Sequence, residues 1–183
     1  MQASKLKEFI RSNKIALLFI AKFVSIYFLC NVLYSGYIQF NYPIADPYTV
    51  TITKQVSYLL NIAGQGTQTI VSTDSPSVGL KKVGKSGVDV FEGCNGVNVM
   101  IVFISFILAF TNSRRKMWVY LLLGLTGIYL LNLVRVMLLF EIAIHYPQHL
   151  YLFHKYILTS FLYTFVFIIW YYWSSPLLAR DER

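Results

Sequence analysis

Four apolar runs dominate the chain, and they constrain its fold more than any other feature. They cover about residues 15–34, 97–110, 118–144 and 156–173. A helix of about 20 apolar residues crosses a bilayer. The chain is 56% hydrophobic and only 13% charged, which is too apolar for an ordinary soluble domain. We therefore predict an all-α integral membrane protein, a single membrane domain over residues 1–183, with about four transmembrane helices.

The formal net charge of +8 raises the alternative of a nucleic-acid-binding protein. The positive side chains, however, flank the apolar runs: Lys5, Lys7, Arg11 and Lys14 precede the first, Arg114, Arg115 and Lys116 separate the second from the third, and Arg180 and Arg183 follow the last. Such placement is typical of cytoplasmic juxtamembrane segments, which also contact anionic lipid. We expect both termini and the link 112–116 to be cytoplasmic, and no nucleic-acid partner.

The first apolar run follows a basic head, as in a signal peptide. Its apolar stretch is long for that role, and no cleavage site with small residues stands out. We interpret it as a retained signal-anchor helix, in which Lys22 reaches toward the interface.

Residues 36–93 form the only sizeable polar region, and the topology places this loop outside. Within 50–62, Val56, Leu59 and Leu60, followed by Ala63, recur at helical spacing. This pattern predicts a surface amphipathic helix along the membrane. Short strands are expected over 67–72, 78–83 and 88–91, with a turn at 84–87, so that the outer loop contains a small β-hairpin.

Residues 79–86 match the phosphate-binding pattern G-x-x-x-x-G-K-S. That motif needs a helix beginning at its Lys-Ser pair, so that backbone amides converge on the phosphates. Here Ser86 is followed by the alternating pattern of a strand. We therefore expect no nucleotide site.

Cys94 precedes the second apolar run, between Gly93 and Gly96. Glycines at these positions suit a tight turn into a helix, and a helix N-terminus favours a thiolate nucleophile. The structural alternative is a packed cysteine at a span boundary. Cys30 lies in the first apolar run and is interpreted as an inert buried thiol. A Cys30–Cys94 disulfide is a further alternative if both thiols lie near the outer face.

Arg135 lies well inside the third apolar run, three residues after Asn132 and on the same helix face. A cation in the apolar zone is costly unless it faces a partner or a wet cavity. A guanidinium there could stabilise an oxyanion. The structural alternative pairs Arg135 with Glu141 or with a backbone carbonyl.

Three histidines, His145, His149 and His154, lie in or beside the predicted outer link 145–155. A zinc site would need further ligands, and Pro147 interrupts any helix there, so we expect no metal and no cofactor. His154 begins the fourth run at a fixed depth, as a catalytic base requires. His149 and His145 remain alternatives for that base.

The three candidate side chains are expected at one level of the membrane. Cys94 begins the second run and His154 begins the fourth, both from outside. Arg135 follows Lys116 by 135 − 116 = 19 residues, or roughly 28 Å of helix. The topology therefore predicts that a thiol, a guanidinium and an imidazole meet in the outer half of the membrane.

At these positions the chain resembles the exosortase/archaeosortase family of membrane transpeptidases. The matching motifs are Glu92-Gly93-Cys94-Asn95-Gly96, Asn132-Leu133-Val134-Arg135 and Phe153-His154. Asn95 stands where the family usually has Ser. The resemblance covers about residues 78–173, and the short chain is most similar to the compact exosortase F type of Bacteroidetes.

The resemblance implies a cysteine peptidase or transpeptidase that acts on C-terminal sorting signals, in which a short motif precedes a membrane helix and a basic tail. Cys94 would be the nucleophile, Arg135 the oxyanion donor and His154 the proton carrier. The neighbouring Glu92, Asn95 and Asn132 are expected to contact the substrate. The resemblance further implies a bacterial inner membrane location, an active site facing the periplasm, and a small exosortase-associated membrane protein as an additional partner.

The competing hypothesis is a non-enzymatic membrane subunit or a small transporter in which Arg135 binds an anion. Transport would be favoured by a relay of carboxylates inside the membrane. The spans contain none beyond Glu141.

Overall fold

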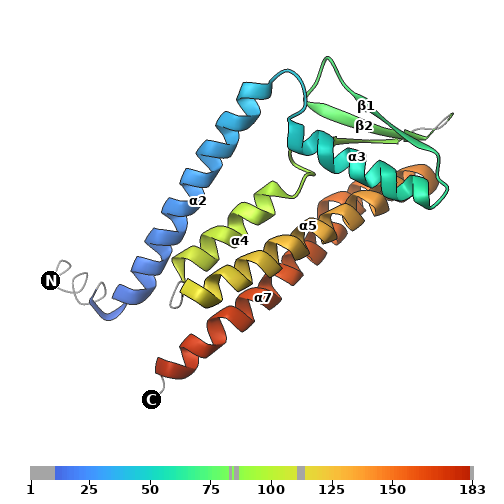
Figure 1. Cartoon of the computed structure of the whole chain (residues 1–183). Helices are drawn as coiled ribbons and strands as arrows, with labels where there is room; N and C mark the ends of the chain where they lie inside the picture. The colour runs from blue at the N-terminus through green and yellow to red at the C-terminus, as the bar shows by residue number, and fades with distance from the viewer. Residues whose placement is uncertain (1–10, 83, 85–86, 111–113, 182–183) are drawn as a thin grey trace.

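A computed structural model describes residues 11–82, 84, 87–110 and 114–181 of the 183. Over these residues the fold is mostly helical, with one small sheet (Figure 1). The elements are α2 (Lys14–Asn41), α3 (Pro47–Ile62), β1 (Thr67–Val71), β2 (Ser77–Lys82), β3 (Gly87–Phe91), α4 (Val97–Ala109), α5 (Arg114–His145), η1 (Pro147–His149), α6 (Leu150–Leu152), η2 (Phe153–Ile157) and α7 (Leu158–Asp181).

Within the described residues, three helical segments are long and apolar enough to cross a membrane: Lys14–Asn41, Lys116–His145 and Pro147–Ser175. The prediction of a multi-pass membrane protein is confirmed to this extent. The predicted span 97–110 is the 13-residue helix α4. Thirteen residues rise only about 20 Å, whereas the hydrocarbon core is about 30 Å thick. Because α4 falls short, a fourth crossing remains a prediction.

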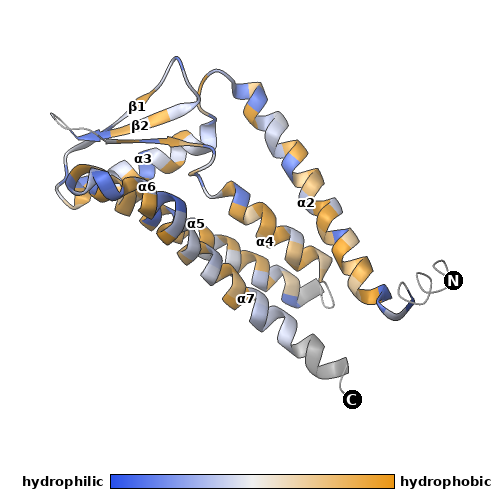
Figure 2. Ribbon diagram, turned by 180° about the vertical axis from the view of Figure 1, so that it is seen from behind, coloured by the Kyte–Doolittle hydropathy of each residue, from blue (hydrophilic) through white to orange (hydrophobic). Residues whose placement is uncertain are grey.

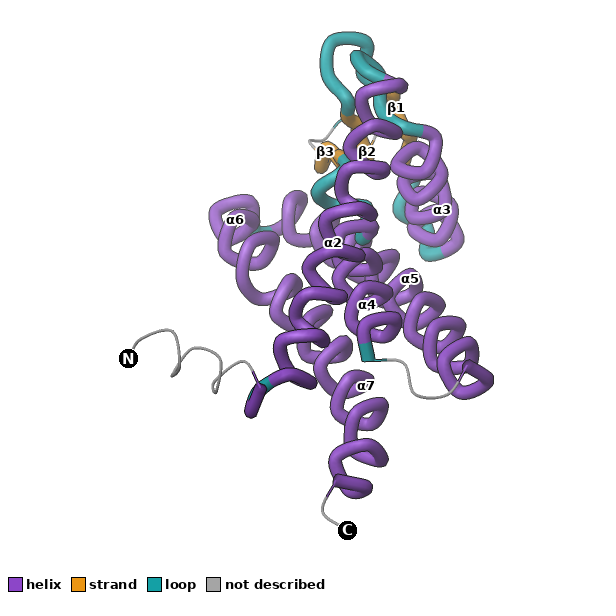
Figure 3. The backbone as a smooth tube through the Cα atoms, turned by 90° about the vertical axis from the view of Figure 1, so that its left-hand side faces the viewer, coloured by secondary structure: helices purple, strands orange, loops and turns teal. Residues whose placement is uncertain are grey.

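Helices α2, α4, α5 and α7 alternate in direction between two ends of the molecule (Figure 1). The start of α2, the end of α4, the start of α5 and the end of α7 lie at one end. The sheet and α3 lie at the other, as the rotated view in Figure 3 also shows. Apolar residues dominate α2 and α4, whereas β1 and α3 carry many polar ones (Figure 2). The basic ends predicted to be cytoplasmic therefore share one end of the molecule.

The segment between α2 and α4 contains a three-stranded antiparallel sheet of order β1-β2-β3, in which the predicted strand 67–72 pairs with the predicted hairpin. The register pairs Gln68 with Lys81 and Lys81 with Gly87. Val78, Leu80 and Val90 on one face are buried, and α3 and α5 pack against the sheet. At the rejected phosphate-loop match, strand β3 begins at Gly87 in place of the helix that phosphate binding needs. Lys85 and Ser86 lie outside the described residues.

Helix α3 begins where Asp46 accepts hydrogen bonds from the backbone N–H groups of Tyr48 and Thr49, at 3.0 Å each. Its apolar face packs with the sheet and α5 in one buried cluster, to which Ile52, Val56 and Leu60 contribute. The predicted Leu59 is 39% exposed, one position off this face. The apolar face of α3 is thus covered by protein, and the position of α3 on a membrane surface stays a prediction.

Two loop boundaries predicted from the sequence were wrong. Helix α2 continues to Asn41, although residues 36–41 were assigned to the outer loop. It ends just before Pro43, because a residue that precedes proline disfavours helical geometry. The link 145–155 is also largely helical, because Pro147 begins a 3₁₀ turn that leads into α6 and η2. A proline is well tolerated in a first helical turn.

Candidate active site

Cys94 lies in the turn that joins the sheet to α4. Strand β3 ends at Phe91, and the Cys94 N–H donates to the Phe91 carbonyl at 2.7 Å. Gly96 then precedes α4 with φ 84°, a conformation that L side chains rarely adopt. A Cβ at Gly96 would also lie 2.9 Å from the Asn132 side chain. The positive φ and the close contact with Asn132 both require glycine at position 96. The resulting turn places Cys94 against α5 in the buried cluster.

His154 meets Cys94 directly. The Nε2 atom of His154 lies 2.8 Å from the Cys94 Sγ atom, within hydrogen-bond distance. His154 lies in η2, a π-helical turn that interrupts the regular helix, and such turns are frequent at functional sites. The His154 ring also lies beside Phe91, with centroids 6.3 Å apart. The structure therefore brings together the thiol and the imidazole that the sequence singled out.

Arg135 is buried, and its guanidinium group contacts the helical segment that carries His154. Its Nη2 atom lies 3.5 Å from the His154 carbonyl oxygen and 3.3 Å from Thr159 Oγ1. Thr159 itself donates to the His154 carbonyl at 2.8 Å. The structural alternative of pairing with a carbonyl is thus realised in part, whereas Glu141 pairs with His145 at 3.4 Å.

One donor of Arg135 remains unused. Among the described residues, no partner accepts from its buried Nε atom. A buried, unpaired guanidinium N–H is costly, and such exceptions call for an explanation. The unpaired Nε donor lies in a residue that also lines a cavity, described below.

Two asparagines fix the turn that carries Cys94. Asn132 of α5 donates through Nδ2 to the Cys94 carbonyl at 3.2 Å. Asn95 is fully buried, and its Nδ2 atom donates to the Tyr34 hydroxyl at 2.8 Å and to Thr49 Oγ1 at 2.9 Å. Its Oδ1 atom accepts from the Val97 N–H at 3.0 Å. Asn95 thereby joins α2, α3 and α4 next to the thiol.

The surroundings of the Cys94 thiol favour its neutral, protonated form. Burial raises the pKa of Cys94 above its ordinary value. The positive charge of Arg135 and the hydrogen bond with the Phe91 backbone lower it, but by less. Because the neutral thiol predominates, attack by Cys94 needs a base within reach, and His154 is in contact.

A cavity of about 360 Å³ opens next to this constellation. Its walls come from the Cys94 turn, α4, α5 and the helical segment that starts at Pro147, and they include Gly93, Asn98, Arg135, Tyr151, His154 and Thr159. Arg135 and His154 are thus reachable by a ligand that enters the cavity.

The remaining predicted residues lie outside the contacts described above. Glu92 is half-buried in the turn that carries Cys94. His145 and His149 are exposed, and no group of three metal-binding side chains occurs in the part of the chain that the structure describes. Cys30 and Cys94 are both free, and Cys30 is half-buried, not buried as predicted.

Sequence reasoning missed Thr159, Tyr34 and Thr49. Thr159 follows His154 by five residues, a spacing that brings it to the His154 carbonyl only because η2 is π-helical. A regular helix would have favoured i+3 and i+4 neighbours. Tyr34 and Thr49 reach Asn95 through tertiary contacts with no local signal.

These features define a multi-pass membrane protein with a cysteine–histidine pair at the end of its helices, the constellation of an activated nucleophile. The family described as "Transmembrane exosortase (Exosortase_EpsH)" matches residues 13–172, and the chain belongs to this family. Membership supports a membrane transpeptidase or protease. Neither the curated proteins nor the solved structures contain a match to the chain.

Proposed function

We propose that the protein is a cysteine transpeptidase or protease that cleaves C-terminal sorting signals at the extracytoplasmic face of the bacterial inner membrane. The observation that carries this proposal is the 2.8 Å contact between Cys94 Sγ and His154 Nε2 beside the buried Arg135. Thiol, base and cation are the parts that thioester formation requires. Family membership supports the same chemistry.

In the proposed reaction, the Cys94 thiol gives its proton to His154 Nε2 while Sγ attacks the carbonyl carbon of the scissile peptide bond. The carbonyl oxygen takes up negative charge, which the unpaired Nε donor of Arg135 stabilises. The intermediate collapses, the C–N bond breaks, and the leaving amine takes the proton from His154. The N-terminal part of the substrate is then a thioester on Cys94.

An amine or other acceptor next attacks the thioester. His154 removes the acceptor's proton and returns it to the departing Cys94 sulfur, so that the enzyme is restored. The acyl product is released on the outer side, and the C-terminal membrane helix with its basic tail stays behind. Proteins that carry such signals are the proposed substrates, and the small exosortase-associated membrane protein is a proposed partner.

Four crossings are part of the proposal, with α4 as a short span. The alternating helix directions and the basic residues at the start of α5 support them (Figure 1). The exosortase F type of Bacteroidetes is likewise proposed, on the resemblance of the motifs alone. The contacts of Asn95 with Tyr34 and Thr49 support a positioning role, and Glu92 and Asn132 remain proposed contacts of the substrate.

The test is the fate of a protein with a C-terminal sorting signal in membranes that contain each variant at equal amounts. Cys94→Ala should abolish processing, because a methyl group forms no thioester. Arg135→Lys should lower processing by about 10²- to 10³-fold, because it keeps the charge but loses the Nε donor. Cys30→Ser is the matched control and should process normally. Full processing by Cys94→Ala would favour the alternative of a non-enzymatic subunit.

A further inference from the structure

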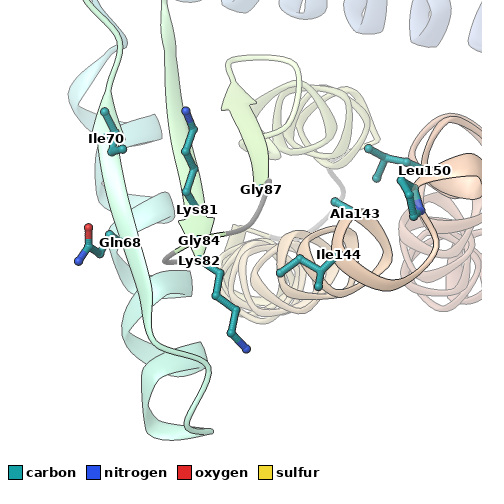
Figure 4. A pocket seen from close by; sticks show the side chains of 10 residues that line it. Gln68, Ile70, Lys81, Lys82, Gly84, Gly87, Ala143, Ile144 and Leu150 are labelled. Atoms are coloured by element: carbon teal, nitrogen blue, oxygen red, sulfur yellow. The ribbon is translucent and has the colours of Figure 1, made fainter.

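A second and larger cavity, of about 910 Å³, lies apart from the candidate site, between the sheet and the outer end of α5 (Figure 4). One wall consists of sheet residues, among them Gln68, Ile70 and Lys81. The opposite wall is apolar and includes Ile144 and Leu150. In Figure 4 the two walls face each other across an open space. Nothing in the proposed reaction uses this cavity.

The charge of the cavity is positive. Lys81 and Lys82 both line it, and none of its described lining residues is acidic. Lys82 is occupied, since its Nζ atom donates to Gln65 Oε1 at 2.8 Å. Lys81 is exposed, and in the described part of the chain no hydrogen bond or ion pair engages its ammonium group. The cavity therefore offers a free cation beside an apolar wall.

The cavity and the thiol are joined by one exposed face of the sheet. Lys81 pairs with Gly87, the first residue of β3, and side chains along a strand alternate between faces. Gly87, Asp89 and Phe91 therefore share the face of Lys81. Phe91 is 42% exposed and contacts the His154 ring. The exposed face leads from the cavity to the candidate active site.

The separation suits a short extended peptide. The four steps from Gly87 to Phe91 cover about 13 Å at the rise of a strand. The eight residues from Arg135 to Ala143, which lines the cavity, rise about 12 Å along α5. Both paths correspond to about four residues of an extended chain.

We propose that this cavity binds an acidic side chain of the substrate about four residues before the scissile bond, through Lys81. The inference rests on the proposed function, because it takes the substrate to be a peptide cleaved at Cys94. The direction is consistent: the sheet lies beyond the outer end of α5, where the part of the substrate before its membrane helix would emerge. Asp89 adds a constraint, because it lies nearer to Cys94 on the same face and repels an acidic residue placed opposite it.

The experiment uses the full chain with Cys30→Ser in detergent, so that Cys94 is the sole cysteine. The probes are peptides of about ten Gly, Ser and Thr residues, long enough to span both sites, which end in a thiol-alkylating chloromethyl ketone. One Glu is moved stepwise along the peptide, and each peptide has a Gln twin. The rate of Cys94 alkylation is measured by intact mass.

With Glu about four residues from the reactive end, the Glu peptide should react about two- to five-fold faster than its Gln twin, as an exposed ion pair allows. This preference should weaken in high salt. Lys81→Gln should remove it, and Lys81→Glu should transfer it to a Lys-bearing peptide. Lys54→Gln, a change to an exposed lysine of α3, should leave it intact. In Asp89→Asn, the preference for Glu should also appear in peptides whose Glu lies closer to the reactive end.

A flat profile along the peptide, or a Glu preference that survives Lys81→Gln, would overturn the inference while alkylation itself still supported the nucleophile. If no probe alkylates Cys94, fluorescent forms of the same peptides without the reactive group are titrated onto Cys94→Ala. Tighter binding of the Glu peptide that depends on Lys81 would then support the cavity without the enzyme. Equal binding of the Glu and Gln peptides, or none, would reject it.

Discussion

The guanidinium of Arg135 lies 3.3 Å from the hydroxyl oxygen of Thr159, which itself donates to the His154 carbonyl at 2.8 Å. Arg135 and Thr159 thus converge on the backbone of the residue whose ring contacts Cys94. The positions of the proposed base and the proposed oxyanion donor are therefore coupled through one hydroxyl group. Thr159 is a positioning residue on this account, since it is not assigned a contact with the reacting atoms.

Thr159→Val should lower processing by up to about 30-fold, because valine keeps the shape but removes both hydrogen bonds, each worth about 1 kcal/mol. Thr159→Ser should restore most of the activity. The measurement is the processed fraction of a sorting-signal protein over time, at matched enzyme levels. A merely structural role would lower the melting temperature of Thr159→Val and leave its processing rate per folded molecule unchanged.

Gly96→Ala should reduce the stability of the folded protein by about 1–3 kcal/mol, because the residue has a positive φ. A Cβ would also meet Asn132. Gly36→Ala is the matched control, since Gly36 lies in α2 with no atom within 4 Å of an added Cβ. Thermal unfolding in detergent should show a loss for Gly96→Ala and none for Gly36→Ala. Equal melting temperatures would contradict the described turn.

Alkylation of Cys94 by iodoacetamide should be slow at neutral pH and should accelerate as the pH rises. The reason is the raised pKa of the buried thiol, which lowers the thiolate fraction at any given pH. Arg135→Gln should shift the profile to still higher pH, because the charge that lowers the pKa is removed. The chain with Cys30→Ser isolates the signal. A rate that is already maximal in mildly acidic buffer would indicate a preformed thiolate.

The orientation of the chain can be tested with a membrane-impermeant thiol reagent. In a Cys30→Ser chain within intact cells, Gln148→Cys should be labelled from the periplasmic side, and Lys116→Cys should be labelled only after the membrane is opened. Both side chains are exposed, so the difference reports sidedness. The reverse pattern would place the candidate site on the cytoplasmic side and contradict the sorting function.

Three of the four predicted spans and the strands followed from hydropathy and alternation, because these patterns directly reflect burial in lipid or against a sheet. The sequence did not predict that residues 36–41 and the link after Pro147 are helical. Gly36 and Pro147 suggested helix breaks, whereas the structure continues or restarts a helix at both positions. Likewise, the apolar positions of α3 predicted that the helix has an apolar face, but not that the sheet and α5 cover this face. A membrane and a protein core select for the same periodicity.

Cys94 and His154 could be selected by their depth, because the predicted topology makes the second and fourth spans parallel and so brings their starts to one level. The contact between Cys94 and His154 depends on the π-helical turn, and no local sequence pattern predicted that turn. For the same reason Thr159 was missed. Asn95 was expected to meet the substrate, whereas its described contacts join three helices next to the thiol.

The most direct test of the central claim, that Cys94 is a nucleophile served by His154, is isolation of the acyl-enzyme. Purified enzyme and a sorting-signal substrate are mixed, quenched in acid, and digested, and the residue that carries the substrate fragment is identified by mass spectrometry. The account predicts a thioester on Cys94, cleaved by hydroxylamine, with the N-terminal side of the substrate attached. It further predicts that the thioester forms far more slowly in His154→Ala and at the normal rate in His149→Ala. Processing without an adduct on Cys94, or equal rates of thioester formation in His154→Ala and the unmodified enzyme, would contradict it.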